Sequence, residues 1–224
     1  MNKPSQVSSN LRHRFFEHLY AINNDVTPAE AQLLWMDITA RYNETQRTYH
    51  SLRHIEHLFV AFDEIDHYLH GPHLIALALY YHDVIYDPMR SDNELKSAEY
   101  ALKTLQPYLP VEQCHDIYTL IMMTASHQLD GLADKQKCSD AAYLLDMDLS
   151  ILGEPWSEYE RYAQAIRCEY AHVPANDYRT GRIAILKKLS VHPQLYLTDY
   201  YHERLETQAR NNIEREIMLL RASG

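Results

Sequence analysis

Apolar residues recur at helical spacing along most of the chain. In segment 50–69 they form a stripe with the three-to-four-residue period of an amphipathic α-helix, and segment 72–81 is apolar all round, which is typical of a buried helix. Thr27-Pro28-Ala29-Glu30 and Ser91-Asp92-Asn93-Glu94 have the sequence of capping boxes that open helices. The pattern predicts about nine or ten helices, at about 11–22, 28–42, 50–69, 72–81, 92–108, 111–126, 140–151, 156–171, 176–190 and 199–221.

The composition agrees with an all-helical domain. Apolar residues make up 46% of the 224 residues and charged residues 23%, which is ordinary for a globular protein. Only 5 glycines are present, so few tight turns are available and helices joined by short loops are favoured over a sheet. No repeat or low-complexity segment marks a domain boundary. We therefore expect one all-α domain.

The charge and the cysteines limit the kinds of partner. The net charge is −10 and no run of Lys or Arg occurs, so a nucleic-acid duplex is not an expected partner. A small anion is compatible, because a metal and a few local cations can outweigh the overall field. The three cysteines are widely spaced and lack a CxxC pair, which favours reduced thiols and a cytoplasmic location. The N-terminus has no signal-peptide pattern, and the longest apolar stretch, 74–81, is too short to cross a membrane.

His82 and Asp83 follow directly on the apolar segment. Burying an imidazole and a carboxylate side by side costs several kcal/mol unless both are satisfied. A divalent metal would satisfy both groups. The alternative is that Asp83 caps a neighbouring helix while His82 donates to a carbonyl, and for this pair alone the alternative is favoured.

Two further segments change that balance. His50 and His54 are four apart, so on a helix they share a face, where one could ligate a metal while the other reaches the substrate. Asp146 and Asp148 are two apart, so on a helix they point about 200° from each other and only one is expected to face a site. For Asp146, the alternative role is an acid in the first turn of its helix, favoured by the helix dipole.

The ordered set His54, His82-Asp83 and Asp148 resembles the H…HD…D signature of the HD superfamily, whose fold is an all-helical bundle. The stretch from Tyr49 to His54 is similar to the opening motif of the cyclic-nucleotide phosphodiesterases. That resemblance implies His50 as the general acid and His54 as a metal ligand. The segment that follows Asp148 is similar to the phosphodiesterase segment with the last ligand, which implies Asp148 rather than Asp146.

The whole string resembles a bacterial family of predicted HD-superfamily metal-dependent phosphohydrolases, over about residues 10–220. The shared landmarks are Tyr-His-x-x-x-His at 49–54, His-Asp-Val-Ile-Tyr-Asp-Pro at 82–88, Asp-Asn-Glu-x-x-Ser-Ala at 92–98, Thr-x-x-His at 124–127, Leu-Asp-x-Asp-Leu-Ser-Ile-Leu-Gly at 145–153, Arg-x-Glu-Tyr at 167–170 and Gly-Arg at 181–182. The resemblance implies a single-domain helical bundle of the HD-domain and phosphodiesterase-like type over 1–224. Its metal-binding core is expected at about 45–155, with C-terminal helices at about 156–221 completing the bundle.

The implied activity is metal-dependent hydrolysis of a small phosphoester, such as a nucleotide, by attack of metal-activated water on phosphorus. One or two divalent ions (Mn, Fe, Co, Ni, Zn or Mg) are expected, and the ligands are His54, His82, Asp83 and Asp148. Asp87 would orient a water or the His82 ring, and His127 is a candidate second-metal ligand or base, against a plain hydrogen-bonding role. Tyr86 stands where alarmone hydrolases have a glutamate, so alarmone hydrolysis is not implied.

The candidate phosphate clamp consists of arginines, because a guanidinium suits bidentate phosphate contacts. Its members are Arg53, Arg167 and Arg182, and the alternative for each is a salt bridge on a helix surface. Two other functions fit the same residues: an HD-fold di-iron oxygenase, and a nucleotide-binding regulatory module without turnover. Tyrosine-rich helices are compatible with a homodimer.

Overall fold

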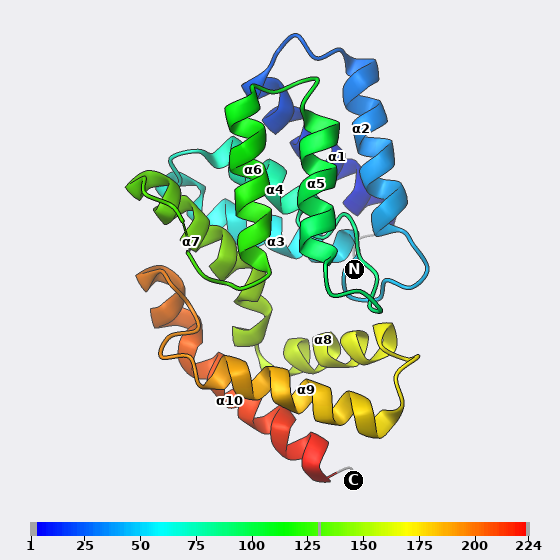
Figure 1. Cartoon of the computed structure of the whole chain (residues 1–224), viewed down its shortest axis with the longest axis vertical. Helices are drawn as coiled ribbons and strands as arrows, with labels where there is room; N and C mark the ends of the chain where they lie inside the picture. Colours follow the sequence, from blue (N-terminus) through cyan, green and yellow to red (C-terminus); the bar gives the residue numbers. More distant parts are fainter. Residues whose placement is uncertain (1–3, 130, 223–224) are drawn as a thin grey trace. The chain divides into compact units, whose positions relative to one another are not determined.

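A computed structural model describes residues 4–129 and 131–222, and all regular structure in these two ranges is helical (Figure 1). The elements are α1 (Pro4–Ile22), α2 (Pro28–Tyr42), α3 (Leu52–Ile65), η1 (Asp66–Tyr68), α4 (Pro72–Tyr81), α5 (Asn93–Leu105), α6 (Val111–Thr124), α7 (Lys135–Leu149), η2 (Ser150–Gly153), α8 (Trp156–Glu169), α9 (Ala175–Ser190) and α10 (Asp199–Ala222), where η denotes a 3₁₀ helix. The all-α prediction is confirmed. None of the described helices combines the length and apolar character that spanning a bilayer requires.

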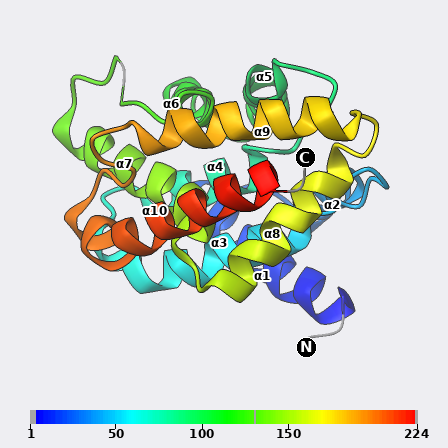
Figure 2. The ribbon, with the colours of Figure 1, turned by 90° about the horizontal axis from the view of Figure 1, so that it is seen from below.

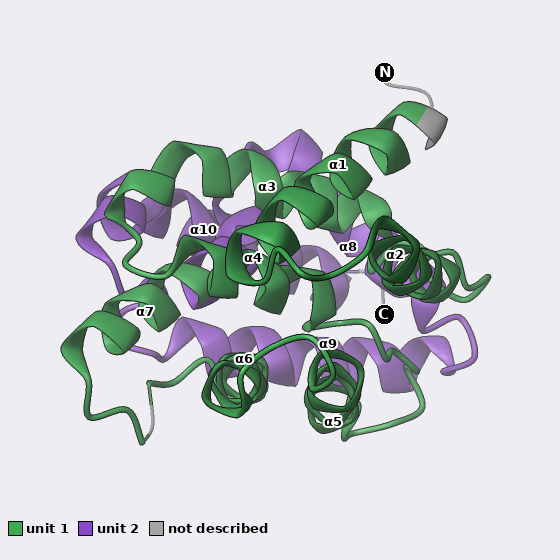
Figure 3. Cartoon of the chain, turned by 90° about the horizontal axis from the view of Figure 1, so that it is seen from above, with its two compact units in different colours: residues 1–144 green, residues 145–224 purple. Residues whose placement is uncertain are grey.

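The chain forms two compact units, residues 1–144 and 145–224 (Figure 3). The division falls inside α7, which is one continuous helix from Lys135 to Leu149. Each unit has its own buried residues and is described by itself. The assignment of the whole chain to a single domain stays a prediction.

The first unit is built around α4. Helix α4 packs against α1, α3, α5 and α6, and α5 lies alongside α6 (Figures 1 and 2). All of its residues from Ile75 to Tyr81 are buried, as the apolar pattern predicts. The Tyr80 hydroxyl donates to the Leu11 carbonyl at 2.7 Å, so this ring fills the core without leaving a polar group unsatisfied. Because α4 is enclosed, the two residues that follow it are positioned rigidly.

The two expected capping boxes have different outcomes. At α2 the box is confirmed: the Thr27 hydroxyl accepts from the Glu30 amide, and the Glu30 carboxylate accepts from the Thr27 amide at 2.9 Å. At α5 the box is wrong, because the helix begins at Asn93 with Asp92 as its N-cap and no side-chain capping bond. The Asp92 carboxylate instead pairs with Arg90 at 2.7 Å, a charge-assisted bond that outcompetes capping.

Two predicted helix starts are also corrected. The helix expected from residue 50 begins at Leu52, so His50 lies in the turn before α3, and the last predicted turn is the separate helix η1. The helix expected from residue 140 begins at Lys135. There the Asp134 carboxylate accepts from the amides of Gln136 and Lys137, at 2.8 and 3.1 Å. This local bonding adds a polar first turn that apolar periodicity does not reveal.

The second unit packs α10 against η2 and α9, and α8 against η2. The buried Asn212 of α10 donates to the carbonyls of Leu152 and Glu154 at 2.8 and 2.7 Å. These carbonyl oxygens at the end of η2 therefore have a hydrogen-bond donor. A buried ion pair joins Arg182 of α9 to Glu216 of α10, with Nε and Oε1 2.8 Å apart. Buried charges of this kind are tolerated because each is paired.

Candidate metal centre

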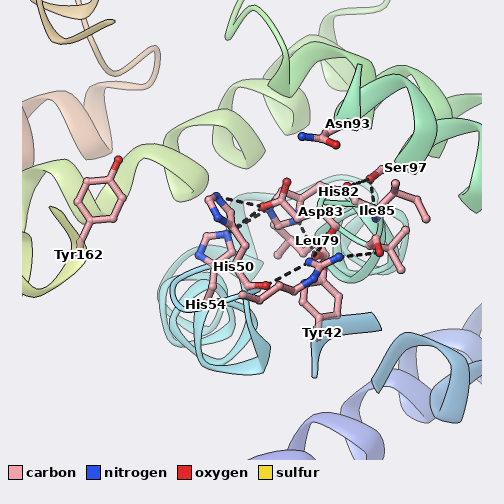
Figure 4. A network of polar contacts seen from close by, with 12 residues as sticks. Tyr42, His50, His54, Leu79, His82, Asp83, Ile85, Asn93, Ser97 and Tyr162 are labelled. Atoms are coloured by element: carbon pink, nitrogen blue, oxygen red, sulfur yellow. Dashed lines mark hydrogen bonds and ion pairs between the residues drawn. The ribbon is translucent and has the colours of Figure 1, made fainter. Parts of the chain in front are cut away.

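Two buried histidines, one from α3 and one from the end of α4, lie side by side in the first unit (Figure 4). His54 lies in the first turn of α3 and His82 is the C-cap of α4. Their Nε2 atoms are 3.1 Å apart. Two ligands on one cation with bonds of about 2.1 Å stand about 3.0–3.4 Å apart at angles between square and tetrahedral. The separation therefore suits two ligands of one ion.

A hydrogen bond at Nδ1 of His82 determines which nitrogen of this ring carries the proton. His82 Nδ1 lies 2.8 Å from the Leu79 carbonyl, which can only accept a hydrogen bond, so Nδ1 carries the proton. In a neutral imidazole, Nε2 then keeps its lone pair toward His54. A backbone carbonyl behind a histidine is the usual arrangement for a metal ligand. The alternative expected for His82 alone, donation to a carbonyl, is thus present and compatible with ligation.

The Asp83 carboxylate adds negative charge beside these rings. Its Oδ2 lies 3.0 Å from Nε2 of His82, 3.8 Å from Nε2 of His54 and 3.9 Å from Nε2 of His50. The side chain is only 15% exposed. Three imidazoles and one carboxylate, all within the first unit, therefore surround one small space (Figure 4).

Asp148, near the end of α7, completes the candidate ligand group. One ligand atom each from His54, His82 and Asp148 lies within 4.8 Å of the others, and such a group could hold a metal ion. Asp146 is occupied elsewhere, because its carboxylate accepts from the amides of Leu197 and Thr198 at 2.7 and 2.8 Å. Of the two acids, Asp148 and not Asp146 belongs to this group, and its role as a ligand stays a prediction.

Asp146 is not the first-turn acid considered as its alternative role, since it lies in the last turns of α7. Burial raises the pKa of its carboxyl to about 6, against the opposing effect of the hydrogen bonds from Leu197 and Thr198. By accepting from the two amides that directly precede α10, it has a structural role in the second unit.

His50 reaches the same space by a route other than the predicted one. It precedes α3, so the argument that it shares a helix face with His54 is wrong. Instead its ring stacks on Tyr86, with centroids 4.1 Å apart, and lies edge-on to His54 at 5.9 Å. The turn before α3 and the loop after α4 hold it there.

Arg47 organises this site and was missed by sequence reasoning. Its guanidinium donates to the carbonyls of His50, Asp83 and Val84, at 3.1, 2.7 and 3.0 Å. Its Nε also bonds the Glu44 carboxylate at 3.1 Å, and its side chain is 0% exposed. One buried cation thus ties the His50 turn to the His-Asp segment, which lies 36 residues further along the chain. The only sequence signal is an arginine three residues before His50.

Asp87 and His127 do not belong to the group of three ligand atoms found among the described residues. The Asp87 carboxylate accepts from the Met89 amide at 2.9 Å, within its own turn. His127 follows α6 with φ 54°, and its amide donates to the Met123 carbonyl at 2.8 Å, which ends the helix. The catalytic roles suggested for both residues stay predictions.

The three arginines suggested as a phosphate clamp have different environments. Arg53 is exposed on α3, next to His54. Arg167 donates to the carbonyls of Tyr170 and Val173. Arg182 is committed to its buried pair with Glu216, and this charge helps to raise the pKa of the guanidinium above its usual value despite burial. The salt-bridge alternative is therefore what the structure shows for Arg182, although its ion pair is buried and not on a helix surface.

Comparison with known proteins adds no relative to this picture: no family model, no curated protein and no solved structure matches the chain.

Proposed function

We propose that this protein is a metal-dependent phosphohydrolase of the HD type, which hydrolyses a small phosphoester such as a nucleotide. One observation carries the proposal: the ligand atoms of His54, His82 and Asp148 gather within 4.8 Å, in the order that the HD signature requires. Asp83, the remaining member of that signature, lies against both histidines. Four ligands from nitrogen and oxygen groups suit Mn, Fe, Co, Ni, Zn or Mg.

A divalent ion bound by these residues would supply Lewis acidity, lowering the pKa of a coordinated water and polarising a phosphoryl oxygen. The reaction joins a water oxygen to phosphorus while the bond from phosphorus to the leaving oxygen breaks. In this proposal His50, whose Nε2 lies 3.9 Å from the Asp83 carboxylate, passes a proton to the leaving oxygen. Arg53, exposed beside His54 on α3, is the candidate for contact with the phosphate.

The proposal is tested by phosphate release from a panel of nucleotides and simple phosphoesters, with each candidate metal added in turn. We expect turnover with at least one metal, and loss of turnover in Asp83→Asn but not in His115→Ala, a control at an exposed histidine of α6. Binding of nucleotides without phosphate release under all metals would instead favour a regulatory module.

A further inference from the structure

A cavity lies next to the histidine cluster, and all of its lining residues belong to the first unit. It has a volume of about 550 Å³ and is bounded by the end of α2, the loop after His82-Asp83, and α5. Tyr86 lines it, and the same ring stacks against His50 at 4.1 Å. A cavity of this size accommodates a small organic ligand, since such pockets typically enclose about 300–1,000 Å³.

The lining is rich in cations, although the chain as a whole carries a net charge of −10. Its basic side chains are the four residues Arg41, Arg90, Lys96 and Lys103. Its acids are the three residues Glu44, Asp87 and Glu99. Arg90 is neutralised by Asp92 at 2.7 Å, and Lys96 by Glu99 at 2.8 Å. Of the three acids, Glu99 is the partner of Lys96, and Glu44 pairs with the buried Arg47 at 3.1 Å. The charges that remain at the cavity are those of Arg41 and Lys103, with Asp87 as the one remaining acid of the lining.

The guanidinium of Arg41 lacks a hydrogen-bond acceptor at its Nε within the described part of the chain. Its Nε is buried and has no hydrogen-bond partner among the described residues, and it forms a long ion pair with Asp37, with Nε and Oδ2 3.7 Å apart. The guanidinium lies over the Tyr100 ring at 4.0 Å, which holds its donors in a fixed plane at the cavity wall. The ion pair with Asp37 is too long for a hydrogen bond, and the side chain is 28% exposed, so the guanidinium keeps donors for an anion in the cavity. Lys103, exposed in the last turn of α5, adds a second positive charge.

We propose that this cavity binds a small phosphorylated anion, held by Arg41 and Lys103. An arginine fork matches phosphate oxygens in geometry, and a lysine beside it supplies a point charge. None of the lining residues belongs to the candidate ligand group, and the cavity adjoins the metal centre through Tyr86 and Asp87. Binding there is therefore expected with or without metal.

Calorimetric titration with inorganic pyrophosphate tests the site, using the full chain after treatment with a chelator. We expect saturable binding that weakens as salt is added. Arg41→Gln and Lys103→Gln should each weaken it about tenfold, the effect of losing one charge-assisted hydrogen bond. Lys135→Gln, at an exposed lysine outside the cavity, should bind as the wild type does.

Lys103→Gln changes an exposed side chain, so its folding is not at risk and it decides the matter if Arg41→Gln fails to fold. No binding by the wild type, or equal binding by wild type and Lys103→Gln, would overturn the proposal. His54→Ala separates the two sites: pyrophosphate binding that is lost in this variant belongs to the metal centre and contradicts a separate cavity site. The phosphohydrolase proposal is unaffected by either result.

Discussion

Replacing Arg47 by methionine removes the cation that ties the two histidine segments together, while keeping a side chain of similar length. Three carbonyl oxygens, those of His50, Asp83 and Val84, then lose their donor in a largely buried position. Each unsatisfied carbonyl costs about 1–3 kcal/mol, and partial access of water to two of them reduces the total. Glu44 is 37% exposed, so water replaces its lost partner at little cost. We expect the free energy of unfolding to fall by about 2–4 kcal/mol.

The second expected effect is on metal binding, because the two segments are no longer held in register. Loss of outer contacts of this kind weakens metal affinity by about 10–100-fold. Urea unfolding gives the stability, and titration calorimetry with Mn²⁺ or Zn²⁺ gives the affinity. Arg47→Lys should recover part of both, since an ammonium retains some of the carbonyl contacts. The reasoning is refuted if Arg47→Met matches Arg12→Met, a control at an exposed arginine of α1, in stability and affinity.

Three other predictions address separate side chains. Asp148→Asn should weaken metal binding with little loss of stability. Asp146→Asn should leave metal affinity unchanged and lower the free energy of unfolding by about 1–2 kcal/mol, because the Asp146 carboxylate accepts from the amides before α10. The opposite result for the two variants would make Asp146 the ligand. His127→Asn, which tolerates the left-handed backbone, should retain metal affinity within about twofold; a larger loss would make His127 a ligand. Burial, with neighbouring His73, lowers the pKa of His18 to about 4, so this ring is neutral in the folded protein. Below the unfolded pKa of about 6.5 the unfolded chain binds more protons, so acidification from pH 7 to pH 5 should cost roughly 1–2 kcal/mol after allowance for partial exposure. His18→Gln should remove that part of the pH dependence in urea unfolding, and an unchanged slope would contradict the assignment.

Apolar periodicity predicts the helices well where packing decides, and less well where polar contacts decide. The buried α4 follows directly from its unbroken apolar run. The capping box at Thr27 forms because the Thr27 and Glu30 side chains both bond each other's backbone amides. The expected box at Ser91 fails because Asp92 binds Arg90, and because the Asn93 side chain bonds the backbone of Asp87 at 2.9 and 3.0 Å. Sequence spacing alone does not rank such competing polar partners.

The candidate site shows a similar division. The grouping of His54, His82 and Asp148 is predicted by their order in the chain, and the structure brings their ligand atoms together. His50 lies beside this group because its ring stacks on Tyr86 and not because it shares a helix face with His54. Its role as a general acid stays a prediction. Arg47 could not be identified, because its hydrogen bonds reach carbonyls 36 and 37 residues away and leave no local pattern.

The central claim is that His54, His82 and their neighbouring carboxylates hold a divalent ion. Metal analysis of protein purified without chelator, followed by calorimetric titration of the stripped protein, measures this directly. We predict at least one tightly bound ion per chain in the wild type and in the His115→Ala control, and its loss in both His54→Ala and His82→Ala. Full metal occupancy in either of these two variants, or no binding of any divalent metal by the folded wild type, would contradict the account.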